Sequence, residues 1–329
     1  MGDTDVHLHN SETLNVSLIE FVVEESDGGE GPAVPEPANL LVIVVLNRRK
    51  CGLSRCVTCY MVAMAVADLL VVIFDLLLMH VPIVFASELH FILQLPVCNL
   101  HSAMIHAAVD ASVWFTVAFS FDRCVAICYQ RLRTRYCTEK TAAAVLGTLA
   151  ALVSLKDISW YFMYTPTYRL TKNFGFCAVE THVSKSVAWG TTELLHYVFT
   201  PCVPFLLVLL FNTFTIRNIL AASAARRRLR GSAKGCKDAE LENRRKSIIM
   251  LFVISGNFIV LWAMFTVSVI QQRLFWLGYQ ISFHVIMQEV GYMLQLLSCC
   301  TNTIIYVMLQ SKFRENLKHR IKCPFSAID

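Results

Sequence analysis

The residues of this chain best able to do chemistry are charged side chains inside apolar segments. They are Asp68, Asp110, Asp122, Arg123, Lys156 and Asp157. A charged group within a membrane segment is costly unless it faces protein or water, so each of these is a candidate functional group. The chain has no P-loop, no His/Cys spacing typical of a metal site and no Ser/His/Asp order typical of a hydrolase. The pattern therefore predicts a binding protein rather than an enzyme.

The elements that must position these charges are long apolar segments. The 329 residues are 56% hydrophobic and 16% charged, whereas a soluble domain carries about 25% charged residues. Apolar stretches near the length of about 20 residues that crosses a bilayer recur along the chain. The expected spans are 38–46, 56–80, 98–128, 139–163, 186–220, 244–272 and 282–310. This predicts an all-α, polytopic membrane protein built as a seven-transmembrane helix bundle.

The distribution of charge predicts how the bundle is oriented. Residues 1–47 hold nine acidic residues and no Lys or Arg, whereas basic residues cluster at 48–55, 131–140, 217–246 and 312–322. Lys and Arg mark cytoplasmic loops, so the alternation predicts an extracellular N-terminus and a cytoplasmic C-terminus. Basic blocks also occur in nucleic-acid-binding proteins, but beside this many spans we expect no nucleic-acid partner.

The first span is anomalous because its apolar segment is only the nine residues from Ala38 to Leu46, one of which is Asn39. We expect either a truncated gene model or alternative exon, or a short or interfacial first segment. The predicted parts are an acidic, disordered N-terminus (1–36) with a glycosylation sequon at Asn15, a membrane domain (37–310), and an amphipathic helix with a cytoplasmic tail (311–329). Cys323 beside that helix is either a palmitoylation site or an idle thiol.

An ordered set of residues along the chain resembles the rhodopsin-like (class A) G-protein-coupled receptors. The set, with the family's spacing, is Asn39, Asp68, Cys98, Asp122, Arg123, Cys177, Pro204, Phe258, Trp262 and 302–306. The chain departs from the family pattern at Cys124, Met264 and Thr303, and it lacks a tryptophan at the position where the family carries one in the fourth span. Within the class, CYMVAMAVAD, the Asn302-Thr303 pair and the SKFR junction are most similar to the orphan G-protein-coupled receptor 139 group.

This resemblance implies a disulfide and an ion site. Cys98 and Cys177 correspond to the family disulfide over the outer mouth of the bundle; the alternative is two unpaired thiols. The residues at the family's sodium positions are Asp68, Ser112, Ser298 and Asn302. Oxygen ligands suit a hard cation, so we expect Na⁺ as an allosteric ion at Asp68 and no other cofactor. The alternative is a protonated, hydrogen-bonded Asp68.

The resemblance also implies an activation switch. Arg123 would pair with Asp122 at rest and face the G protein when active, with Phe258, Trp262 and Tyr306 coupling the ligand to that end. Many family members place an acid at the foot of the sixth span, but this chain has Arg244 there. We therefore expect that Arg123 is held only weakly at the cytoplasmic end and that the receptor has some basal activity. The alternative for Asp122 and Arg123 is a plain ion pair at the membrane edge.

The candidate ligand-binding residues follow from family position and from their polarity inside or at the rim of the spans. They are His106, Asp110, Glu193, His196, Gln288 and Glu289. Each has the alternative of a helix–helix hydrogen bond. An Asp110–Lys156 pair would lower the cost of both charges. Ile105 stands where amine receptors carry an acid and Leu296 where opsins carry their lysine, so neither subclass is expected.

The function that follows is a plasma-membrane, multi-pass receptor. It would transmit the binding of an extracellular peptide or small molecule, such as an amino acid, to a heterotrimeric G protein, with basic inner loops that contact the G protein or anionic lipid. The short first span and missing prolines favour the alternative of a non-signalling or decoy seven-helix protein. The chain shows no internal repeat, which disfavours a transporter.

Overall fold

The computed structural model describes residues 38–47, 54–75, 95–162, 187–229, 239–276, 278–280 and 285–309, and these ranges contain helices and no strands. The elements are α2 (Ala38–Asn47), α3 (Arg55–Val72), α6 (Leu95–Cys128), α7 (Gln130–Tyr136), α8 (Glu139–Asp157), the 3₁₀ helix η3 (Ile158–Phe162), α10 (Val187–Leu229), α11 (Ala239–Trp276) and α12 (Val285–Leu309). In lipid only a helix or a closed barrel satisfies its own backbone polar groups, which accounts for the helices in these ranges.

Five of the described segments are long and apolar enough to cross a membrane, namely Arg55–Asp75, Asn99–Cys128, Glu139–Phe162, Val187–Ala222 and Phe252–Phe275. The helices α2 and α12 complete a seven-helix bundle, so the predicted fold class is confirmed. The described helix α2 has ten residues, a length of about 15 Å, whereas the hydrocarbon core is about 30 Å thick.

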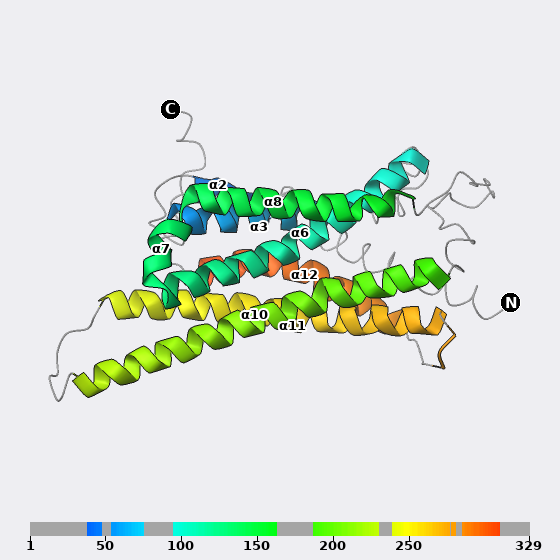
Figure 1. The fold of residues 1–329 in the computed structure, drawn as a ribbon. Helices are drawn as coiled ribbons and strands as arrows, with labels where there is room; N and C mark the ends of the chain where they lie inside the picture. The colour runs from blue at the N-terminus through cyan, green and yellow to red at the C-terminus, as the bar shows by residue number, and fades with distance from the viewer. Residues whose placement is uncertain are drawn as a thin grey trace, which may run out of the picture.

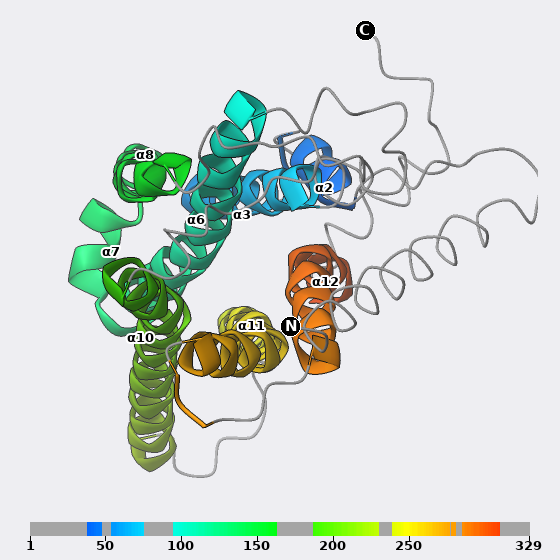
Figure 2. The ribbon, with the colours of Figure 1, turned by 90° about the vertical axis from the view of Figure 1, so that its right-hand side faces the viewer.

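The bundle is organised around α6, which crosses obliquely between two groups of helices (Figure 1). In Figure 1 helices α2, α3 and α8 lie above it and α10, α11 and α12 below it. The end-on view shows α6 running from between α8 and α3 toward α10 (Figure 2). We call the end with α7 the α7 end and the opposite end, with η3, the η3 end. Because α6 touches α3, α8, η3 and α10, its side chains can link both groups.

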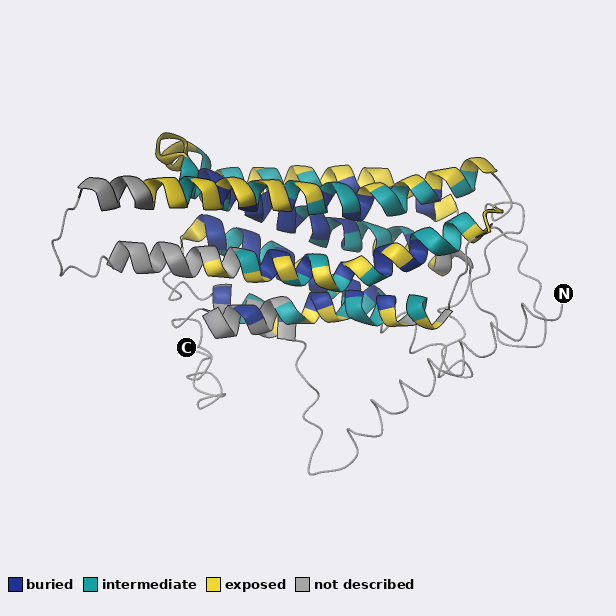
Figure 3. Cartoon of the chain, turned by 90° about the horizontal axis from the view of Figure 1, so that it is seen from below, coloured by how far each residue is buried: buried dark blue, intermediate teal, exposed yellow. Residues whose placement is uncertain are grey.

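Dispersion is the main attraction between the apolar side chains of this bundle. The surrounding lipid is as apolar as these side chains, so moving them from lipid into the protein gives no hydrophobic gain. Buried residues lie between the helices and exposed residues along the outside (Figure 3). The largest side chains that are almost fully buried include Tyr60, Met61 and Phe119, at the contact of α3 with α6. Helices α11 and α12 approach closely at Gly291, where an added Cβ would lie 2.8 Å from Phe265 Cα.

Local capping explains where two helices begin. Ser54 precedes α3 in an extended conformation, and its hydroxyl accepts a hydrogen bond from Val57 N at 3.4 Å. Thr138 does the same for α8 by accepting from Thr141 N at 3.2 Å. Such caps satisfy amide groups that the first helical turn leaves without partners.

The helix bounds differ from the expected spans in a few places. The fourth span becomes 3₁₀ at Ile158 instead of staying α-helical to 163. At the α7 end, α10 reaches Leu229 and α11 begins at Ala239, so both extend past the apolar segments. Helix α10 continues through Pro201 and Pro204.

Several sequence predictions lie outside the described residues. These are the disordered region 1–36, the sequon at Asn15, the disulfide partner Cys177, the amphipathic helix after residue 310, and Cys323.

Candidate functional site

The polar side chains of α6 form three levels along the bundle, and the level at the α7 end is the Asp122–Arg123 pair. Arg123 Nε donates to Asp122 Oδ2 at 3.0 Å, and Nη2 contacts the same oxygen. Cys56 Sγ of α3 donates to the other oxygen, Oδ1, at 3.2 Å. Asp122 is fully buried, and its carboxylate is fixed between Arg123, the next residue in the chain, and Cys56 of α3.

The guanidinium of Arg123 also lies 5.7 Å from the centroid of the Phe119 ring. Cys137, between α7 and α8 and outside the membrane-spanning segments, donates to the backbone oxygen of Asp122 at 3.9 Å. Burial raises the pKa of Cys137 to about 11, so it stays a neutral thiol. The side chains of Arg244 and Tyr306, which were predicted to act at this end, lie outside the described residues.

The middle level joins α6 to α3 through Asp68. Ser112 Oγ donates to Asp68 Oδ1 at 2.5 Å, and Asp68 is 1% exposed. Ser298 of α12 is also buried, and the side chain of Asn302 lies outside the described residues. Two of the four residues predicted to bind Na⁺ are therefore hydrogen-bonded directly. Oxygen-rich surroundings of this kind suit a hard cation.

An aromatic cluster lies between the middle level and the η3 end. Phe258 and Trp262 of α11, predicted to couple the two ends, have ring centroids 5.4 Å apart. Phe205 of α10 lies 5.2 Å from Phe258, and Phe265 lies 5.9 Å from Trp262. Phe265 in turn packs on Tyr292 of α12 at 5.1 Å. The cluster thus connects α10, α11 and α12 through tilted and edge-to-face contacts, which aromatic rings prefer.

At the η3 end, α10 and α11 are joined by an ion pair. Arg273 Nη1 lies 2.7 Å from Glu193 Oε2, and the guanidinium lies 5.6 Å from the centroid of the Tyr197 ring. Gln272 Nε2 of α11 donates to Gln288 Oε1 of α12 at 3.0 Å. Both predicted ligand-binding residues in these contacts, Glu193 and Gln288, therefore have helix–helix partners. The side chain of Glu289 lies outside the described residues.

His106 of α6 is stacked on Trp160 of η3. The ring centroids are 3.9 Å apart with an interplanar angle of 10°. His106 Nδ1 donates to Ser102 O at 2.7 Å. Sequence reasoning missed Trp160; its position three residues after Asp157 places it one turn further along the same face, which is the signal that could have found it.

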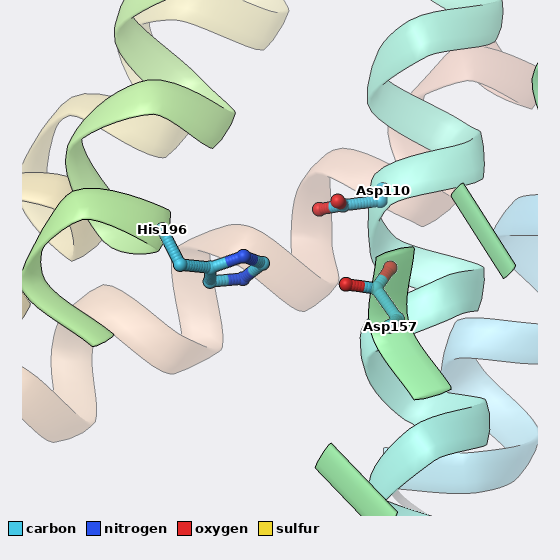
Figure 4. A group of neighbouring side chains, drawn as sticks. All are labelled: Asp110, Asp157 and His196. Atoms are coloured by element: carbon cyan, nitrogen blue, oxygen red, sulfur yellow. The ribbon is translucent and has the colours of Figure 1, made fainter. Parts of the chain in front are cut away.

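The third level is a cluster of ionisable groups from three helices. Lys156 Nζ of α8 contacts Asp110 Oδ2 of α6, the pair considered from the sequence. The same Nζ lies 3.2 Å from Asp157 Oδ1 and 3.2 Å from His196 Nδ1 of α10. Figure 4 shows the two carboxylates and the imidazole directed toward one another. Asp157 and Lys156 were noted as unusual in a span, but their convergence with His196 was not predicted.

The predicted disulfide is only partly placed by the structure. Cys98 lies in the first turn of α6 at the η3 end, and its side chain is not among those described; Cys177 lies outside the described residues. The disulfide between Cys98 and Cys177 therefore stays a prediction from the sequence.

Comparison with known proteins agrees with this architecture. The family model of the 7 transmembrane receptor (rhodopsin family) matches residues 38–306. C-C chemokine receptor type 3 of Macaca mulatta is 22% identical over 293 residues, which cover 85% of this chain and 74% of the relative. The human thyrotropin-releasing hormone receptor is 21% identical over 310 residues, covering 87% and 74%. Cysteinyl leukotriene receptor 1 of Cavia porcellus is 27% identical over 207 residues, covering 61% and 54%.

Proposed function

The chain belongs to the rhodopsin family of seven-transmembrane receptors, and from this premise we propose that it transmits the binding of an extracellular ligand to a heterotrimeric G protein. A member of this family is a multi-pass membrane receptor, and we propose no catalytic activity for it. The receptor domain would be residues 37–310, preceded by the acidic segment 1–36 and followed by the amphipathic segment 311–329.

We place the α7 end in the cytoplasm and the N-terminus outside the plasma membrane. Arg131, Arg133 and Arg135 of α7 are all exposed, as are Arg55 and Lys140 nearby. Basic residues within about 15–20 residues of a span favour the cytoplasmic side. These side chains would contact the G protein or anionic lipid.

The observation that carries the proposal is the Asp122–Arg123 pair at this end. Arg123 is 12% exposed and holds a buried carboxylate, so the pair stabilises one arrangement of the α7 end. A G protein that binds the guanidinium would favour an arrangement in which the pair is open. By reciprocity, a ligand that favours the open arrangement would bind more tightly when the G protein is present. Trp262 and Phe258 would relay the ligand's effect, and Tyr306 would complete the switch.

We infer that the ligand enters from the η3 end and is a peptide or a small molecule such as an amino acid. Glu193 and Arg273 offer both charge signs there, and His106 and Trp160 offer flat rings. The named relatives are receptors for a chemokine, a leukotriene and a releasing hormone, so they support a receptor without selecting one ligand class.

The finer assignments remain proposals that rest on the sequence. They are the place within the orphan G-protein-coupled receptor 139 group, the Cys98–Cys177 disulfide, Na⁺ bound by Asp68, Ser112, Ser298 and Asn302, glycan at Asn15 and palmitate at Cys323.

The test is ligand-free nucleotide exchange on a purified heterotrimeric G protein by the chain in lipid nanodiscs. We expect exchange above that of empty nanodiscs for the wild type, and a loss of that excess in Arg123→Ala. Glu139→Gln is the control, because this exposed acid lies at the same end of the bundle and is assigned no contact with the G protein. Exchange equal to that of empty nanodiscs, from folded receptor and with each G-protein subtype, would favour the non-signalling alternative that the ten-residue α2 motivates.

A further inference from the structure

The ammonium group of Lys156 is surrounded by lone pairs from three helices. Its partners are Asp110 of α6, Asp157 of α8 and His196 of α10. The ligand atoms of the two acids and the imidazole all lie within 4.8 Å of one another. An ammonium group only donates hydrogen bonds, so His196 Nδ1 must accept here, and its lone pair is directed at the cation. The cluster is therefore a cation site that a lysine occupies.

The cluster places two buried acids beside one ammonium group. Asp110 is 0% exposed and Asp157 is 1% exposed, while one lysine is their neighbouring cation. When both acids are ionised and the imidazole is neutral, two carboxylates and one ammonium carry a net charge of −1 inside the bundle. Asp110 Oδ1 and Asp157 Oδ2 are buried and accept no hydrogen bond from the described residues. Buried charge without full compensation is unfavourable, so the site favours an additional positive charge.

We propose that these three side chains form a binding site for Zn²⁺, in which the Lys156 ammonium is a built-in competitor. Two carboxylates neutralise a divalent ion, and the lone pair that now accepts from lysine becomes the nitrogen ligand. Zinc takes nitrogen and oxygen ligands in tetrahedral sites, with three protein ligands and an open fourth position for water. Ca²⁺ and Mg²⁺ require more oxygen ligands than this cluster supplies, and the imidazole favours a transition metal.

The geometry allows the exchange of lysine for metal. Ligand atoms around zinc lie about 3.3 Å apart for bonds of about 2.0 Å, so the cluster must contract by roughly 1.5 Å at its widest. Side-chain rotation at three separate helices can supply this. Lys156 is in the last turn of α8 and its side chain is 46% exposed, so it can extend toward the membrane surface when displaced. Thr200 Oγ1 lies 3.5 Å from His196 Nδ1, so a hydroxyl group also lies beside the proposed nitrogen ligand.

The test is Zn²⁺ titration of the purified, chelator-treated chain in nanodiscs, measured by calorimetry, with the visible absorption of bound Co²⁺ as a spectroscopic check. Asp157→Asn should weaken zinc binding by at least about tenfold, since even partners of the ligands change metal affinity by about 10- to 100-fold. Lys156→Gln should strengthen it by a comparable factor, because the competitor is gone. Glu139→Gln is the control, because this exposed acid of the same helix lies outside the cluster.

The opposite signs of the two main variants separate a metal site from misfolding, because a misfolded protein would lose affinity in both. Equal affinity in the wild type and in Asp157→Asn would overturn the site, and an unchanged affinity in Lys156→Gln would overturn the competition. Metal binding is measured without any G protein, so this result stands apart from the proposed signalling function. His196→Ala should abolish the tetrahedral Co²⁺ spectrum, and its persistence would also overturn the assignment.

Discussion

Replacing Asp122 with asparagine removes the charge that holds Arg123 while keeping the shape of the side chain. In the structure Oδ2 accepts from two guanidinium nitrogens and Oδ1 accepts from Cys56 Sγ. The amide that replaces the carboxylate could retain one weak acceptor for Arg123 but no charge. We therefore expect Asp122→Asn to shift the bundle toward the arrangement with an open α7 end.

The size of the shift follows from the burial of the pair. A hydrogen bond to a charged group contributes about 1.5–3 kcal/mol, and this pair is well shielded, with Asp122 fully buried and Arg123 12% exposed. Each 1.4 kcal/mol changes a population ratio about tenfold. Because the amide retains one acceptor, the lower part of that range applies, and ligand-free exchange should rise about tenfold where the open state is the minor one.

The assay is ligand-free nucleotide exchange at matched receptor density, together with thermal unfolding in the same nanodiscs. Asp122→Asn should also lower Tm, because the variant leaves a largely buried guanidinium without its counter-charge. The matched control is Glu139→Gln, which breaks the Arg55–Glu139 pair at 3.2 Å. That pair is 70% and 57% exposed, and exposed pairs contribute about 0–1 kcal/mol, so exchange should stay at the wild-type level. Exchange by folded Asp122→Asn at or below the wild-type level would refute the reasoning.

Three further predictions follow from other contacts. Gly291→Ala should destabilise the bundle by about 1–3 kcal/mol and lower Tm, because the added Cβ would lie 2.8 Å from Phe265 Cα. Gly256→Ala is the control: its added Cβ meets nothing within 4 Å, so it should not lower Tm. If Na⁺ binds at Asp68, then Na⁺ should raise Tm relative to choline in the wild type and have no such effect in Asp68→Asn, and an equal effect in both would exclude the site. Burial raises the pKa of Cys137 to about 11. The rate at which Cys137 is alkylated should therefore rise by about tenfold per pH unit up to that pH, as measured by mass spectrometry of its peptide. A rate that stops rising near pH 9 would contradict the burial.

The sequence was enough to predict the class of fold but not how the helices face one another. The length and polarity of the spans follow from the thickness of lipid, so the helical bundle could be read from composition. The pairing of Asp122 with Arg123 joins neighbours in the chain and needed little tertiary information. The contact of Trp160 with His106 depends on how η3 lies against α6, and no local pattern determines that. The convergence of three helices on Lys156 was missed for the same reason.

One part of the tertiary arrangement follows from two polar contacts between α3 and α6. Helices α3 and α6 run in opposite directions and are joined at two polar contacts, Ser112 with Asp68 and Asp122 with Cys56. The two contacts lie ten residues apart on α6, about 15 Å along its axis, and together they fix the rotation of α6 against α3. Residues two apart on a helix do not share a face. Once Ser112 faces α3, Asp110 must therefore face away from it, toward α8 and α10.

Asp110 accordingly lies where α8 and α10 supply its partners, Lys156 and His196 among them. The Lys156 cluster and the Asp68–Ser112 contact thus lie on opposite faces of the same turn of α6. A rotation of α6 that loosened Asp110 from Lys156 would also change the Ser112–Asp68 distance. Because apolar packing in lipid is less directional than hydrogen bonding, these polar contacts define the rotation of the helix. A metal ion that replaces the lysine should therefore alter the Na⁺ dependence of Tm in the wild type, and an unaltered dependence at saturating Zn²⁺ would show that the two faces are independent.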